Sequence, residues 1–139
     1  MKNKLKIVIT ILFTAINSIS FAQEYETKEE VFQEDIFSIV ENMPEFPGGQ
    51  DSMYKFLSTT IIYPNEAKEK QIQGVVYVNF VIEKDGTMSN VKIIRGIHQL
   101  LDDETLRVVN LFPKWTPGTQ NGEVVRVSFN LPLSFKLKE

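Results

Sequence analysis

The sequence predicts a two-layer α+β domain in which helices cover one face of a three-stranded antiparallel sheet. Two patterns carry this prediction. Residues 75–83 and 89–95 place apolar side chains at every second position on either side of Asp85-Gly86, which indicates a hairpin, and the first of these segments has one apolar and one mixed face. Residues 124–135 alternate in the same way and follow Asn121-Gly122, a dipeptide typical of a tight two-residue turn. The long final alternation predicts the third strand.

The first 22 residues have the pattern of a secretory signal peptide. Lys2, Lys4 and Lys6 precede a short apolar stretch at residues 7–16, and a small-x-small cleavage site ends at Ala22. The apolar stretch is shorter than the roughly 20 residues that a membrane-spanning helix needs. We therefore expect cleavage after Ala22 and export, most simply to a periplasm. The alternative is a retained anchor in the inner membrane, with the chain facing the periplasm.

Cleavage would leave an acidic protein. Three lysines would be lost, so 12 basic residues would remain against 18 acidic ones, and the net charge would change from -3 to -6. An acidic surface is poorly suited to phosphate backbones, so no nucleic-acid partner is expected. The chain contains no cysteine, which excludes disulfides, thiol catalysis and a lipid-modified cysteine.

An acidic arm is predicted at residues 23–45, before a domain at residues 46–139. The arm has eight acidic residues against the single Lys28, and blocks of like charge usually stay solvated. We therefore expect the arm to pack loosely on the domain. Its apolar residues leave two alternatives open, a short amphipathic helix from Phe32 or an edge strand at residues 36–40.

Two helices are expected before the first strand. Apolar residues at helical spacing predict a helix over residues 50–59. A second helix is expected to begin at Tyr63-Pro64, because proline in the first turn gives up no hydrogen bond. It should bury Ala67 and end at Gly74, a glycine suited to a left-handed cap or to the start of a strand.

A third helix is expected from Leu101-Asp102 onward. The Asp102 carboxylate is predicted to cap it by accepting N–H groups of the first turn. Apolar residues within the range 106–112 would form its buried side, and Pro113 would end it. Trp115, between this proline and Pro117, is expected to fill the core at a corner of the chain.

The order of the elements predicts the strand order second, first, last, because the last strand can pair antiparallel only with the first. The last strand is then an edge strand. Pro132 has no N–H, so its nitrogen should face away from the first strand. Backbone direction alternates along a strand, so Val124, Arg126, Ser128 and Asn130 would also turn their N–H and C=O groups outward. We expect these groups to be available to a partner strand, with pairing ending near Pro132.

No catalytic or metal site is expected. His98 is the only histidine, and there is no cysteine to complete a metal site or to act as a nucleophile. The carboxylates of Asp102, Asp103 and Glu104 are explained by their place at a helix start, where they face the positive end of the helix dipole. The sequence therefore predicts no enzyme activity, no cofactor and no metal ion.

Seven short motifs follow one another along the chain. They are YPNEA from Tyr63, a strand that begins at Gly74, Asp85-Gly86, LDDE from Leu101, PKWTPG from Pro113, Asn121-Gly122, and VSFNLPLSF from Val127. In this order they closely resemble the C-terminal domain of TonB, the bacterial energy-transducing protein, over about residues 43–137. The motif positions are Tyr63, Pro64, Gly74, Asp85, Gly86, Asp102, Trp115, Pro117, Asn121, Gly122 and Pro132.

The resemblance implies a protein-binding module of the periplasm. TonB C-terminal domains recognise a short extended segment of outer-membrane transporters, the TonB box, which adds as a strand beside the last strand of the domain. In this chain the resemblance maps that contact to Val124, Arg126, Ser128, Asn130 and Leu131.

Full-length TonB proteins are anchored in the inner membrane, couple to the ExbB and ExbD motor, and cross the periplasm on a Pro-rich spacer. This chain departs from that pattern in its cleavable amino-terminal segment and in the lack of a Pro-rich spacer. We therefore expect binding linked to TonB-dependent uptake, with ExbB and ExbD as partners only if the amino terminus is retained as an anchor. The alternative is an envelope interaction module or a homodimer that uses the same edge strand without a role in transport.

Overall fold

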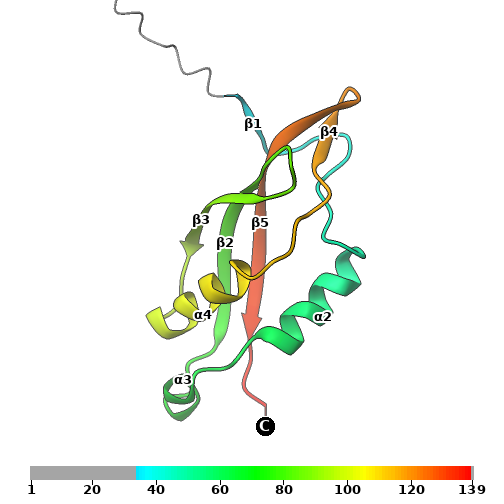
Figure 1. Cartoon of the computed structure of the whole chain (residues 1–139). Coiled ribbons are helices and arrows are strands. Elements are labelled where there is room, and N and C mark those ends of the chain that lie inside the picture. Colours follow the sequence, from blue (N-terminus) through cyan, green and yellow to red (C-terminus); the bar gives the residue numbers. More distant parts are fainter. Residues whose placement is uncertain (1–33, 139) are drawn as a thin grey trace, which may run out of the picture. The chain divides into compact units, whose positions relative to one another are not determined.

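The computed structural model describes residues 34–138, so the predicted signal peptide and the first half of the acidic arm, up to residue 33, lie outside the described residues. Three helices and five strands form an α+β unit, as the sequence predicts (Figure 1). In chain order they are β1 Ile36–Phe37, α2 Gln50–Thr60, α3 Asn65–Glu69, β2 Gly74–Ile82, β3 Met88–Arg95, α4 Gln99–Val109, β4 Gly118–Gln120 and β5 Glu123–Phe135.

The sheet differs from the predicted three-stranded antiparallel sheet. Its order is β1-β5-β2-β3, and β4 pairs with the start of β5. The sheet is mixed, because β1 runs parallel to β5 while the other pairs are antiparallel. The prediction that the last strand forms the edge is therefore wrong at its amino-terminal part, where β1 lies beside it. Two- and three-residue strands such as β1 and β4 are too short to show an alternation that would decide between a strand and another structure.

The core lies on the face of the sheet that alternation predicts. Val76, Val78, Phe80 and Ile82 of β2 are fully buried, and β5 buries Val127, Leu131, Leu133 and Phe135 on the same face. The two strands pair from Gly74 with Phe135 to Ile82 with Val127, without a break in register. A continuous register keeps one face of both strands apolar over its whole length.

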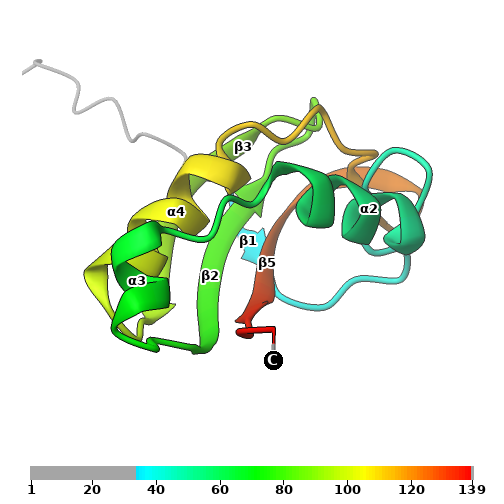
Figure 2. The same cartoon turned by 90° about the horizontal axis from the view of Figure 1, so that it is seen from below.

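The three helices cover that apolar face, as expected (Figure 2). Met53 and Leu57 of α2, Ala67 of α3 and Leu101 of α4 all join the core cluster. Pro64 is the residue before α3 rather than inside it. The helix ends at Glu69, before Gln71 adopts a left-handed conformation with φ 55°, so the chain turns there rather than at Gly74.

The start of α4 corrects the predicted cap. The helix begins at Gln99, and His98 is its N-cap, with Nδ1 accepting a hydrogen bond from the Leu100 N–H at 3.1 Å. Asp102 lies inside the first turn, where Oδ1 accepts from the Ile97 N–H at 3.2 Å. The helix also ends earlier than predicted, at Val109. Asp and Asn are stronger N-cap signals than histidine, which is why the sequence favoured Asp102.

Trp115 fills the corner between α4 and β4, as predicted. Its side chain is 4% exposed and packs against the rings of Phe46, Phe80 and Phe129. The backbone N–H of Trp115 donates to the Gly86 carbonyl at 2.9 Å, which holds this corner against the β2–β3 turn. Edge-to-face aromatic packing of this kind adds to the stability that comes from burial alone.

The described part of the arm is paired rather than loosely packed. β1 lies beside β5, which bears out the alternative of an edge strand for Ile36–Phe37. Further along, Asn42 exchanges two backbone hydrogen bonds with Thr119, and Glu45 exchanges two with Thr116. These pairs fix residues 42–45 to the segment that leads into β5.

Candidate functional site

The candidate site is the side of β5 that faces away from β2. Val127 pairs with Ile82 of β2 and also with Phe37 of β1. A strand has only two sides, so β1 and β2 lie on opposite sides of β5. The side that carries β1 is the one on which the sequence predicted partner binding.

The β4–β5 turn shows which residues of β5 face each side. Asn121 and Gly122 both have positive φ, 51° and 76°, and Gln120 pairs with Glu123 across this two-residue turn. The two residues that flank such a turn exchange backbone hydrogen bonds. Glu123 and every second residue after it therefore direct their N–H and C=O groups first toward β4 and then toward β2. Even-numbered residues of β5 therefore direct their N–H and C=O groups to the other side.

Pro132 agrees with this alternation. It lies opposite Tyr77 of β2 at an even position, so the sheet loses no N–H donor there. Ser128 and Asn130 share that direction. Leu131 does not, because it is an odd position, and its side chain is buried at 3% exposure opposite Val78.

Beyond Val127, the structure describes no strand on the outward side of β5. β1 covers only Arg126 and Val127. Among the predicted site residues, Val124 is 41% exposed beside the turn, and Arg126 is covered by β1. Ser128 and Asn130 lie at the uncovered part. The site therefore consists of a covered start and an open continuation that ends at Pro132.

Polar side chains line the open continuation on the face away from the helices. Asn79 of β2 donates from Nδ2 to the Ser128 hydroxyl at 2.8 Å and to Asn130 Oδ1 at 2.6 Å. The same amide lies 3.3 Å from the Phe129 carbonyl oxygen. These bonds hold the two outward-facing residues of β5 to β2, so the uncovered backbone is carried by a well-supported strand.

Arg126 anchors the covered start. Its Nε and Nη2 donate to the Glu83 carboxylate at 2.7 and 2.9 Å, and Nη1 donates to the Glu34 carbonyl oxygen at 3.1 Å. The hydrogen bond from Arg126 holds the pKa of the Glu83 carboxyl below its ordinary value, although burial opposes this effect. Lys84 pairs with the Glu34 carboxylate at 2.7 Å. No sequence pattern indicates this group, because it joins residues from three separate segments.

The profile of the family described as Gram-negative bacterial TonB protein C-terminal matches residues 59–137. The chain belongs to this family. TonB proteins act in the bacterial envelope, and their C-terminal domains are interaction modules of TonB-dependent transport. The match contains α3, β2, β3, α4, β4 and β5, and hence all of the candidate strand.

A solved structure of a TonB C-terminal domain has a similar fold. One solution structure of the Helicobacter pylori domain, residues 179–285, is 25% identical with a TM-score of 0.50, and the match covers 67% of this chain and 88% of that one. A second, of residues 194–285, is 26% identical with a TM-score of 0.47 and coverages of 64% and 94%. None of the curated proteins compared with the chain matches it.

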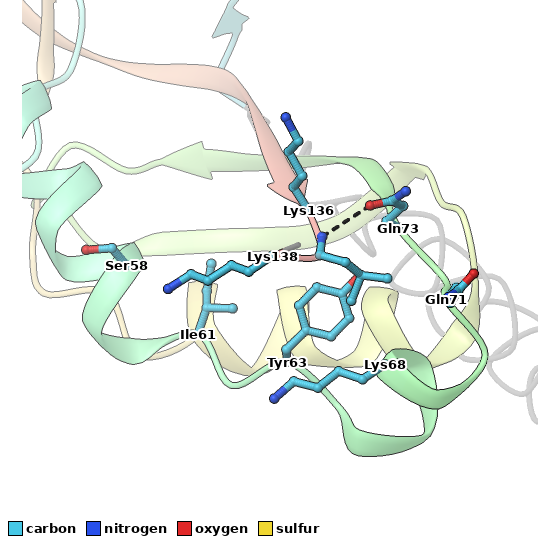
Figure 3. A pocket seen from close by; sticks show the side chains of 9 residues that line it. Ser58, Ile61, Tyr63, Lys68, Gln71, Gln73, Lys136 and Lys138 are labelled. Carbon is cyan, nitrogen blue, oxygen red and sulfur yellow. Dashed lines mark hydrogen bonds between the residues drawn. The ribbon is translucent and has the colours of Figure 1, made fainter.

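An open groove lies at the other end of this TonB C-terminal domain, past the end of β5 (Figure 3). It has a volume of about 1570 Å³, and the described residues that line it include Lys68, Lys136 and Lys138 but no Asp or Glu. Gln73 closes one wall by accepting the Leu137 N–H at 3.1 Å. The groove lies beyond Pro132, where pairing along β5 is expected to end, so it is not part of the candidate strand.

Between residues 34 and 138, the structure gives little support for other kinds of site. Histidine and acidic side chains form no group of three in this range that would hold a metal ion. No helix in the same range is long and apolar enough to cross a membrane. The buried carboxylate of Glu104 is occupied by structural bonds, because it accepts from Arg107 and from the Ile62 N–H at 2.7 Å.

Proposed function

We propose that the protein binds TonB-box-like segments of outer-membrane transporters by adding them as a strand to the outward side of β5. The observation that carries this proposal is the outward side of β5 from Ser128 to Asn130, beside which the described residues place no strand, in a member of the TonB C-terminal family. An extended segment added here would continue the sheet and take its affinity from main-chain hydrogen bonds.

The hydrogen bonds available set the length of the interface. Ser128 and Asn130 each offer one N–H and one C=O on the outward side, and each bond made there contributes about 0.5–1.5 kcal/mol net. Pro132 offers a carbonyl but no donor. While β1 covers Arg126, the interface open to a partner is therefore short, and its affinity depends on only a few backbone bonds together with side-chain contacts on either face.

The proposal places the protein in the periplasm after export. It rests there on the family, whose members act in the envelope, and on the signal-peptide pattern of residues 1–22, which lie outside the described residues. In this setting the protein would serve as an adaptor or a competitor at transporters. Energy transduction would need a membrane anchor and a motor in addition to the binding strand.

Amide NMR of residues 23–139 tests the proposal. The protein is titrated with peptides that cover the periplasmic amino-terminal segments of outer-membrane transporters from the same cell. We expect shift changes concentrated between Val124 and Leu131, and weaker changes for the same peptides with a central proline, which removes one donor. A folded protein without shifts from any peptide would contradict the proposal. A mass that rises with protein concentration would instead favour a homodimer formed through the same strand.

A further inference from the structure

The arm of the protein occupies the side of β5 that a partner would use. β1 pairs in parallel with Arg126 and Val127, at the beginning of the outward side. One side of a strand accepts only one neighbouring strand at a given position. A partner that pairs along the full outward side of β5 must therefore take the place of β1.

Polar groups hold the arm against β5 at Glu34. Glu34 uses its backbone carbonyl to accept from Arg126 and its carboxylate to bind Lys84 at 2.7 Å. The Lys84–Glu34 pair is about half exposed, at 48% and 57%, and exposed ion pairs are weak and screened by salt. We call residues 34–37, together with the Lys84–Glu34 ion pair, the clasp.

Little apolar burial supports the clasp. Ile36 stays 40% exposed, Phe37 is only partly buried, and the strand itself is two residues long; Ile39, just past the clasp, is 85% exposed. Past Val40, which is buried, the chain is fixed by the paired backbone of Asn42 and Thr119. The clasp can therefore open about Ser38–Ile39 without disturbing the rest of the fold.

We infer that the clasp is an autoinhibitory strand, which covers the start of β5 in the free protein and is displaced when a partner strand binds. This inference rests on the proposed function, because it names what regulates the same site. The apparent affinity for a partner is then the affinity of the open form multiplied by the fraction of time that the clasp is open. A clasp closed for roughly nine-tenths of the time weakens binding about tenfold.

A disulfide that locks the clasp tests the inference in a chain that has no cysteine of its own. Ile36 and Arg126 are direct neighbours across the β1–β5 pair, at the roughly 4.8 Å spacing of adjacent strands, which suits a disulfide. The variant Ile36→Cys/Arg126→Cys is oxidised or reduced, and the transporter peptides are titrated against both forms. We expect binding at least about tenfold weaker in the oxidised form, since reduction frees an arm that has also lost its arginine contact.

Single variants Ile36→Cys and Arg126→Cys, treated in the same way, control for oxidation itself. Equal affinities of the locked and reduced forms would overturn the inference and leave the proposed function intact. A peptide that binds neither form nor the unaltered chain would overturn the proposed function, and the inference with it.

A second measurement needs no peptide. Hydrogen exchange of the backbone amide at position 126, which is a cysteine in the double variant, should be slower in the oxidised than in the reduced form, because this N–H faces the clasp. Lys84→Gln should speed that exchange in the otherwise unaltered chain. Lys70→Gln breaks the similar ion pair with Glu66, also 2.7 Å long but on α3, and should leave the exchange unchanged. Exchange that responds to neither the lock nor Lys84→Gln would overturn the inference.

Discussion

Gly86 shows how the lack of a side chain fixes one corner of the molecule. Its φ is +85°, and a Cβ atom there would lie 2.0 Å from the Trp115 carbonyl oxygen. We expect Gly86→Ala to lower the free energy of unfolding by at least about 2 kcal/mol, from backbone strain together with this clash. Urea unfolding measures the loss.

Gly122 is the matched control for that prediction. Its φ is +76°, but nothing lies within 4 Å of an added Cβ. Gly122→Ala should therefore show the backbone cost alone, about 1 kcal/mol. Equal losses in the two variants would mean that the close approach of the Trp115 carbonyl oxygen adds no cost to the backbone strain at Gly86.

Glu104 is a buried carboxylate that joins α4 to the segment between α2 and α3. It accepts from the Ile62 N–H at 2.7 Å and from Arg107, whose Nη2 also donates to the Thr60 carbonyl. We expect Glu104→Gln to cost about 1–3 kcal/mol, because the amide cannot satisfy all of these donors. Glu66→Gln, which breaks an exposed pair with Lys70, should leave the urea midpoint almost unchanged. A similar midpoint in both variants would contradict this role for Glu104.

At the scale of elements, β2, β3 and β5 could be predicted because each is long enough to show its alternation, and α2 because its apolar residues recur at helical spacing. The Asn121-Gly122 turn was predicted as well, although the partner strand β4 was not. β1 and β4 depend on neighbours: Ile36 lies beside Arg126, and Gly118 beside Val125. No local pattern shows such pairs. The outward side of β5 could be predicted from one proline, but its partial cover could not.

Ser128→Pro tests the role of β5 as a binding strand. The missing N–H lies on the outward side, so the β2–β5 ladder keeps its bonds and the fold should persist. The loss of one backbone bond of about 1–1.4 kcal/mol should weaken peptide binding roughly fivefold to tenfold. Ser134→Pro also removes an outward N–H but lies past Pro132, so peptide affinity should be preserved. Equal affinities in NMR titrations of the two variants would place the interface elsewhere.

At the scale of the whole molecule, two acidic side chains link stability to pH. The hydrogen bond from Arg126 lowers the pKa of Glu83 from its usual 4.5, against the effect of burial. Burial of Glu104 acts to raise its pKa, but hydrogen bonds from Arg107 and the Ile62 N–H outweigh it, and the pKa lies below 4.5. A carboxyl whose pKa is lower in the folded than in the unfolded state binds fewer protons when folded, so it stabilises the fold above the unfolded pKa.

This linkage predicts that stability is level near neutral pH and falls in acid. The free energy of unfolding should be nearly constant from pH 7 to about pH 5 and should decrease below pH 4.5, as protonation reaches first the unfolded and then the folded carboxyls. Urea unfolding at a series of pH values measures the slope. Glu104→Gln should reduce the slope below pH 4.5, because one of the carboxyls whose pKa is lowered in the folded state is gone. Glu83→Gln should reduce it too and also speed amide exchange at Arg126, since the guanidinium that holds the clasp loses its main support. A slope unchanged in both variants would mean that other carboxyls set the acid stability of the protein.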